Sequence, residues 1–365
     1  MKNCESDNME FMKKNTLIEK IDPDNIDSKV VEQFGKMLAD GKTVIFPTET
    51  VYGLGANALD EQAASKIYVA KGRPSDNPLL VHVAEREDIN PLVVDMDERA
   101  KKLIDRFWPG PLTIVFKKSD LIPKVTSGGL DTVAIRMPSD KVARALIKAS
   151  GVPIAAPSAN LSGKPSPTKP EHIVADMDGR VDGILVGGFC DFGVESTIVD
   201  LSEDLPMVLR PGAITLEMLK EVLGDVILDP SLSSHDDNIK AKAPGMKYKH
   251  YSPNANIFMV PGGIDRFVEL SEFLLQTKAN YEKNIAILCM KQNIDRFEGL
   301  KLKYRNVQVI SLGRTYDEVA RNLFDVLIDL DRREIDEAYV ETFEERGIGV
   351  AIMNRLKKSA GYKFV

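Results

Sequence analysis

Cysteine, tryptophan and histidine are all scarce in this sequence of 365 residues, which contains three, one and four of them. The cysteines Cys4, Cys190 and Cys289 lie far apart and form no CxxC pair, which argues against a disulfide framework or a cysteine-rich zinc site. Long apolar runs are missing too, so we expect no membrane contact. Because no apolar stretch near Met1 could act as a signal peptide, we predict a cytoplasmic protein.

Positive charge is not in excess either. The net charge of −7 gives the chain no overall attraction for nucleic acid. One basic cluster, between residues 240 and 250, contains no acidic residue and is made of Lys240, Lys242, Lys247, Lys249 and His250. This cluster is compatible with an RNA contact and equally with a solvated linker.

The order of periodic segments predicts two α/β domains, as the length also suggests. Between residues 27 and 228, strand-like runs mix with helical patterns, and some strands follow one another directly. This order predicts a twisted, mixed open sheet with helices on its faces. Residues 1–26 are assigned to an N-terminal tail, and the polar residues 229–254 to a linker or lid. Residues 255–365 predict a smaller open-sheet α/β domain.

Four segments of the first domain concentrate polar residues where strands should end. The first follows the strand Thr43–Phe46 and reads PTETVYGLGANA, which brings hydroxyls and a carboxylate to a sheet edge. Its glycines also fit the GxGxxA pattern of dinucleotide sites. That match is weak because six residues separate Phe46 from Gly53, whereas a true fingerprint follows its strand directly. A plain strand-exit turn is the simpler interpretation.

The second segment contains Lys71 and Arg73 on either side of a glycine, followed by two prolines and then by His82. Two cations at this spacing can turn toward one anion, as in a polyphosphate clamp. The alternative is a helix end whose cations complement the helix dipole. His82 lies in a predicted strand, where a lone histidine is more often structural than catalytic.

The third and fourth segments add further polar groups. Residues 153–168 place Ser158 and Asn160 just after a strand of small residues, and Ser196 and Arg210 lie at the margins of two later strands. Gly163-Lys164 is no P-loop, because the GxxxxGK[ST] spacing is absent. Taken together, three cations, several hydroxyls and an amide suit phosphate binding and electrostatic activation better than covalent or redox catalysis.

These motifs together resemble one family. KxR at Lys71 and Arg73, SxN at Ser158 and Asn160, and PTETVYGLG are similar to the YrdC-type threonylcarbamoyl-AMP synthases. The linker sequence APGMKYKHYSP resembles the signature of the long, two-domain form, and the resemblance covers about residues 27–365. It implies a YrdC-like domain with a deep basic cavity and a Rossmann-like second domain.

The resemblance also implies an activity. The family's enzymes are nucleotidyltransferases that join L-threonine, bicarbonate and ATP into L-threonylcarbamoyladenylate and pyrophosphate, for the threonylcarbamoyladenosine modification of tRNA next to the anticodon. Mg²⁺ is expected as a cofactor held mainly by the ATP phosphates, with no protein metal ligand. The expected partners are downstream threonylcarbamoyl-transfer proteins, with tRNA or double-stranded RNA as further candidates.

Site residues are carried over from the motifs. The expected catalytic residues are Lys71 and Arg73. The residues expected to bind ATP are Arg73, Asn77, Thr132, Ser158, Asn160, Ser166, Arg210 and Tyr251. The residues expected to hold threonine are Thr50, His82, Arg136, Ala156 and Ser196, with Arg136 facing the carboxylate. Lys247, His250 and Tyr251 are expected to form a lid over ATP.

Two other functions compete with this prediction. An RNA-binding or translation-factor module would use a basic cavity and linker to recognise RNA by shape. A carbamoyl-adenylate enzyme of the hydrogenase-maturation type shares the domain but carries zinc-finger segments, which the scattered cysteines exclude. Pyrophosphate release from ATP without RNA separates the synthase from the binding module.

Overall fold

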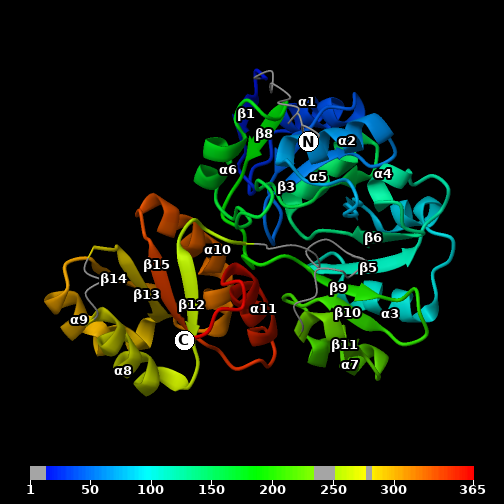
Figure 1. Ribbon diagram of the computed structural model, residues 1–365. Helices are drawn as coiled ribbons and strands as arrows, with labels where there is room; N and C mark the ends of the chain where they lie inside the picture. The colour runs from blue at the N-terminus through cyan, green and yellow to red at the C-terminus, as the bar shows by residue number, and fades with distance from the viewer. Residues whose placement is uncertain (1–13, 234–250, 277–281) are drawn as a thin grey trace, which may run out of the picture.

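The computed structural model describes residues 14–233, 251–276 and 282–365. These residues form two sheets, one of eleven strands and one of four, each with its own helices (Figure 1). The larger sheet contains both parallel and antiparallel pairs, and all neighbours in the smaller sheet are parallel. The predicted fold class, a mixed α/β protein with a second, smaller α/β domain, is confirmed.

The larger sheet has the strand order β1-β8-β2-β3-β7-β4-β6-β5-β9-β10-β11. Its strands are β1 (Leu17–Lys20), β2 (Val44–Phe46), β3 (Gly53–Asn57), β4 (Leu80–His82), β5 (Leu112–Lys117), β6 (Thr132–Arg136), β7 (Ile154–Ala155), β8 (Gly183–Val186), β9 (Thr197–Asp200), β10 (Met207–Arg210) and β11 (Ile227–Leu228). Its helices are α1 (Ser28–Ala39), α2 (Glu61–Lys71), α3 (Glu98–Phe107), α4 (Lys124–Ser127), α5 (Lys141–Ser150), α6 (Pro170–Met177) and α7 (Leu216–Leu223).

Strands β1 and β3 of this sheet, as well as the short β11, were not predicted. The predicted tail contains β1, which pairs with β8 in parallel, so the larger domain begins at or before Leu17 and not at residue 27. The glycines of the first polar segment lie inside β3, which is antiparallel to β2. A Cβ at Gly55 would lie 2.7 Å from Phe46 Cε1, so the glycine serves close packing. The glycines therefore form no dinucleotide-binding turn.

Helix α2 shows how local sequence positions a site residue. The Asp60 side chain accepts hydrogen bonds from the backbone N–H groups of Gln62 and Ala63 and so caps the start of the helix. Gly72 adopts φ +60° and ends it, as glycine does without steric cost. Lys71 is therefore the last helical residue and lies where the helix meets the loop after β7.

The smaller sheet has the order β12-β15-β13-β14. Its strands are β12 (Asn256–Val260), β13 (Ile285–Met290), β14 (Val307–Gly313) and β15 (Glu337–Glu341), and its helices are α8 (Gly263–Leu275), α9 (Glu298–Lys303), α10 (Tyr316–Arg332) and α11 (Gly349–Ser359). Figure 1 shows α10 and α11 between this sheet and the larger domain. The predicted linker begins with a 3₁₀ turn (Pro230–Ser233), and its residues 234–250 lie outside the described residues.

The two domains share apolar packing. Val51 and Val194 of the larger domain belong to the same buried cluster as the core of the smaller one. Gly193, with φ +68°, packs so closely that a Cβ there would lie 2.2 Å from the Arg321 carbonyl oxygen. Ion pairs at the margin join Lys169 to Asp325 at 2.6 Å. Within the described residues, no helix is long and apolar enough to cross a membrane.

Candidate active site

A row of polar residues crosses the centre of the larger sheet. Parallel pairing of β4 with β6 places His82 opposite Arg136, and antiparallel pairing of β5 places Thr113 opposite Arg136. Ser196 precedes β9, and Arg210 ends β10 beside a β-bulge that shifts its register. The same strands also contribute a small buried apolar cluster, which is made of Leu80, Val115, Ala134, Ile198 and Leu209. Residues that are distant in sequence are thus aligned by strand register.

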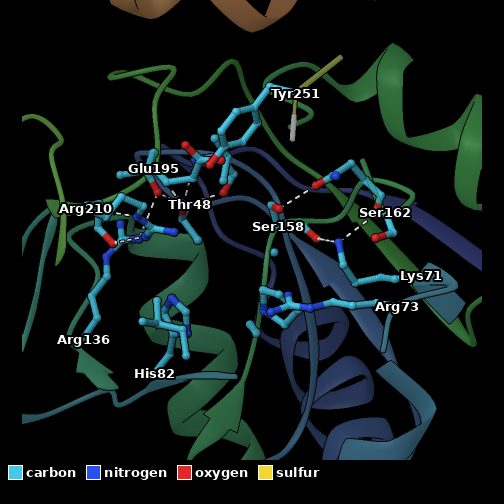
Figure 2. A pocket seen from close by; sticks show the side chains of 18 residues that line it. Thr48, Lys71, Arg73, His82, Arg136, Ser158, Ser162, Glu195, Arg210 and Tyr251 are labelled. Carbon is cyan, nitrogen blue, oxygen red and sulfur yellow. Dashed lines mark hydrogen bonds between the residues drawn. The ribbon is translucent and has the colours of Figure 1, made fainter. Parts of the chain in front are cut away.

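One pocket opens onto this row (Figure 2). Its lining residues are Thr48, Thr50, Val51, Gly53, Lys71, Arg73, Leu80, His82, Arg136, Ala156, Pro157, Ser158, Asn160, Ser162, Glu195, Ser196, Arg210 and Tyr251. In the view of Figure 2, Lys71 and Arg73 lie on one side, Arg136 and Arg210 on the other, and Tyr251 lies above them. The pocket therefore gathers all the residues predicted to bind ATP or threonine except Asn77, Thr132 and Ser166.

Lys71 is a buried cation at one end of the pocket. Its Nζ donates hydrogen bonds to the carbonyl oxygens of Ser158 and Asn160, the latter at 2.6 Å. Burial, reinforced by the neighbouring guanidinium of Arg73, holds the pKa of Lys71 well below its usual value. An anion in the pocket would restore that pKa. This is the electrostatic behaviour expected of a phosphate-binding lysine.

The Ser158–Asn160 segment forms a turn facing Lys71. Ser158 Oγ donates to Asn160 Oδ1 at 2.5 Å, and Asn160 Nδ2 donates to the carbonyl oxygens of Leu161 and Lys164 at 2.8 and 2.9 Å. Asn160 therefore orders the loop, while the hydroxyl of Ser158 faces the pocket beside Lys71 (Figure 2).

Arg136 occupies the opposite end and is held by three groups. Its Nη1 donates to Thr50 Oγ1 at 2.9 Å, its Nε donates to Gly110 O at 3.3 Å, and its Nη2 lies 2.7 Å from Glu49 Oε1. Burial would raise the pKa of Glu49, but the charge and hydrogen bond of Arg136 outweigh it and lower that pKa. The planar guanidinium is thus fixed in orientation at the pocket wall, as recognition of a carboxylate requires.

His82 is neutral in this setting. It is 2% exposed and packs edge-on against Phe46, with ring centroids 6.3 Å apart. Burial and the charge of Arg136 lower its pKa to about 3. A neutral imidazole beside Arg136 can accept or donate one hydrogen bond without adding charge to the pocket.

Ser196, Thr113 and Arg210 form a hydrogen-bonded group. Ser196 Oγ lies 2.8 Å from Thr113 Oγ1, and Arg210 donates to both Ser196 Oγ and Ser196 O, at 3.1 and 3.0 Å. Burial lowers the pKa of Arg210 to about 10, which leaves it protonated at neutral pH. The polar row thus offers a cation and hydroxyls side by side.

Glu195 is a charged residue of the pocket that was not predicted from the sequence. Its Oε1 accepts a hydrogen bond from Ser166 Oγ at 2.7 Å, and its Oε2 accepts two from Arg355 of α11, both at 3.1 Å. Glu195 stands next to Ser196 in a segment already recognised as polar, so its position was a signal. No sequence signal marked Arg355, because it lies within a helical pattern 160 residues from Glu195.

Three predicted residues lie outside the pocket lining. Ser166 is fully buried behind Glu195, and Asn77 is 1% exposed with its carbonyl bonded to Tyr68. Thr132 starts β6, opposite Lys117 of β5. Their contacts with a nucleotide stay predictions. The predicted lid residues Lys247 and His250, and the basic cluster around them, lie outside the described residues, whereas Tyr251 is described and lines the pocket.

The carboxylate that lines the pocket, Glu195, and the one behind Arg136, Glu49, are both paired with arginine. Glu49 pairs with Arg136 and Glu195 with Arg355. Among the residues that the structure describes, no group of three or more His, Cys, Asp or Glu side chains could hold a metal ion.

A mixed open sheet with a pocket that has cationic side chains at both ends and hydroxyl groups between them defines an α/β protein whose site is suited to small anionic ligands. Known proteins are similar to this chain in sequence. Residues 36–212 match the family described as Telomere recombination, and residues 214–361 match the family described as Threonylcarbamoyl-AMP synthase, C-terminal domain.

The similar proteins match along most of the chain. This chain is 45% identical to the threonylcarbamoyl-AMP synthase of Pyrococcus abyssi, over 90% of this chain and 93% of that relative. It is also 45% identical to the threonylcarbamoyl-AMP synthase of Bacillus subtilis, over 92% of this chain and 94% of that relative. The crystal structure of P. abyssi Sua5 complexed with L-threonine superposes with a TM-score of 0.89 at 43% identity, covering 96% of this chain and 99% of that one. The chain belongs to the threonylcarbamoyl-AMP synthase family, in its two-domain form.

Proposed function

We propose that this chain joins L-threonine, bicarbonate and ATP into L-threonylcarbamoyladenylate and pyrophosphate. The observation that carries the proposal is the pocket itself, which places two cations, Lys71 and Arg73, opposite a polar end built around Arg136. The first end suits a triphosphate and the second an amino acid. Curated relatives that match along most of the chain are named for this reaction.

Threonine would bind at the Arg136 end. Its carboxylate would pair with the guanidinium that Glu49 and Thr50 hold in place. The neutral imidazole of His82 would then contact the substrate without repelling its amine. A crystal structure of the P. abyssi relative is described as complexed with L-threonine, which supports an amino-acid subsite in this fold.

ATP would bind with its phosphates toward Lys71 and Arg73. The threonine amine takes up the carbon of bicarbonate with loss of water, and a carbamate oxygen then attacks the α-phosphorus as the bond to pyrophosphate breaks. Positioning and charge neutralisation dominate such a reaction. Lys71 and Arg73 would offset charge on the phosphates, and Mg²⁺ would arrive with ATP as its counterion.

The product is an anhydride that water destroys, so we propose that it passes to proteins that transfer the threonylcarbamoyl group to tRNA. We place this reaction in the cytoplasm, where ATP and tRNA are present. The basic cluster at residues 240–250 is the candidate contact for RNA.

The proposal is tested by measuring pyrophosphate release from MgATP with bicarbonate present. Release that requires both L-threonine and bicarbonate, and that falls with L-serine or glycine, supports it. Pyrophosphate release that does not depend on which amino acid is present would point to another carbamoyl-adenylate enzyme. No release from folded protein would favour the RNA-binding module instead.

A further inference from the structure

Arg355 reaches the wall of the pocket from the second domain. It is 0% exposed, and its Nε and Nη2 both donate to Glu195 Oε2 at 3.1 Å. Its Nη1 donates to the carbonyl oxygen of Pro211 at 2.6 Å, so every side of the guanidinium is fixed. Glu195 lines the pocket, but Arg355 does not and stands behind it.

Glu195 faces two cations, Arg355 and Arg210. Burial would raise its pKa, but Arg355 and Arg210 outweigh burial and lower the pKa to about 2. Glu195 is therefore a full negative charge at neutral pH. One carboxylate and two guanidiniums therefore meet here, and together they carry one net positive charge. Without Arg355 this group of side chains would carry no net charge.

The charges that act on Lys358 of α11 agree with this net positive charge. Lys358 lies one helical turn after Arg355. Burial, together with the charges of Arg355 and Arg210, lowers the pKa of Lys358 to about 8, although Glu195 acts in the opposite direction. The surroundings are thus positive in spite of the glutamate. A triphosphate needs such an excess of positive charge, since an uncompensated carboxylate in the wall would repel it.

We infer that Arg355 is a positioning residue for the nucleotide, which acts by neutralising Glu195 from behind the pocket. The second domain thereby contributes to the charge of the active site without touching substrate. This inference rests on the proposed function, because it assigns ATP to the pocket. It gives the second domain a role that packing alone would not.

A purely mechanical role for the same contact makes a different prediction. If Arg355 only fastened the domains together, as the pairs of Lys169 with Asp325 and Lys164 with Asp331 do, its loss would matter whether or not Glu195 carried a charge. If it neutralises Glu195, removing the negative charge should compensate for removing the positive one. A double-mutant cycle separates the two roles.

The experiment measures MgATP binding to the full-length protein by calorimetry, for wild type, Arg355→Met, Glu195→Gln and the double variant. We expect Arg355→Met to weaken MgATP binding about tenfold or more, as one unbalanced charge near a polyanion should. The double variant should return to within about threefold of wild type. Threonine affinity should stay within about twofold in all four proteins, because Arg136 and Thr50 are unchanged.

Two further variants serve as controls. Arg355→Lys keeps the charge and should bind MgATP more tightly than Arg355→Met. Lys357→Met lies on the same helix, removes an exposed pair with Glu345, and should bind like wild type. Circular dichroism verifies folding. If Arg355→Met does not fold, the MgATP affinity of Glu195→Gln tests the inference, since this variant should bind MgATP at least as tightly as wild type.

Any one of three outcomes would overturn the inference. The first is a folded Arg355→Met variant that binds MgATP with wild-type affinity, and the second is a double variant that binds MgATP no more tightly than Arg355→Met. The third is a Glu195→Gln variant that binds MgATP more weakly than wild type. A wild-type protein that does not bind MgATP would instead remove the proposed function, and this inference with it.

Discussion

Lys71 combines near-complete burial with a positive charge that its surroundings disfavour, which is an arrangement that a structural residue rarely needs. We predict that Lys71→Met lowers pyrophosphate release at least about 100-fold, as loss of one preorganised electrostatic group does. The matched control is Lys66→Met on the same helix, whose Nζ donates to Gly41 O outside the pocket. Near-normal release by Lys71→Met, measured under saturating substrates, would remove this lysine from the mechanism.

The pH dependence of the reaction should reflect Lys71 and not His82. With a pKa of about 3, His82 stays neutral from pH 5 upward, so no step is expected near pH 6.5. Lys71 has a lowered pKa and loses its charge as the pH rises through that lowered value. The kcat/KM for ATP should therefore fall on the alkaline side before pH 10.5 is reached. A midpoint at or above 10.5 would contradict this assignment.

Which residues could be predicted depended on whether a local pattern marked them. Lys71, Ser158 and Arg210 stand at the ends of periodic segments, and the structure brings them into one pocket. Glu195 was overlooked because its neighbour Ser196, at the margin of a strand, was assigned as the polar group of that segment. Arg355 could not be found from sequence, because its partner is defined only by how the two domains pack.

Among the elements, two helical glycines offer a direct test of packing. A Cβ at Gly35 of α1 would lie 2.8–2.9 Å from Ala149 and Ser150 of α5, whereas a Cβ at Gly299 of α9 meets nothing within 4 Å. We predict that Gly35→Ala lowers the free energy of unfolding by about 1–3 kcal/mol, because the backbones are forced apart.

The matched variant Gly299→Ala should raise the free energy of unfolding by about 0.5–1 kcal/mol, because alanine loses less backbone entropy in a helix. Urea unfolding followed by circular dichroism measures both changes. Equal effects of the two substitutions would show that the crossing of α1 and α5 does not depend on Gly35.

Elements with strong periodicity or clear caps were predicted closely. The sequence pattern predicts helices at residues 61–71, 141–150, 216–223 and 349–359 and strands at 183–186 and 285–290. Helices α2, α5, α7 and α11 and strands β8 and β13 have these bounds. Strands β1 and β3 were missed for different reasons. The first is a short strand, LIEK, whose partner β8 lies far along the chain, and the second is rich in glycine, so neither carries the usual β-branched signal.

At the scale of the whole molecule, the domains are joined by apolar packing as well as by ions. Val51 and Val194 are buried in the core of the smaller domain, and the pair of Glu195 with Arg355 is buried between the two. We predict a single cooperative transition in scanning calorimetry, since separating the domains would expose a buried charge and apolar surface together. Two resolved transitions, with the first leaving one domain native, would contradict this coupling.

The two-domain organisation could be predicted from the polar, aperiodic segment after Leu228, and the fold class from the order of strands and helices. The arrangement of the domains could not, because it depends on contacts such as that of Gly193 with the Arg321 backbone. A glycine there is needed for a close approach that no local pattern reveals.

The pair of Glu195 with Arg355 also constrains how this chain can evolve. A substitution at either position leaves a buried charge without its partner, and the two positions are 160 residues apart in different domains. Natural variants should therefore keep both residues or change both, so that the two positions co-vary. Chimaeras that exchange the second domain for one without this arginine should regain function through second-site changes at position 195.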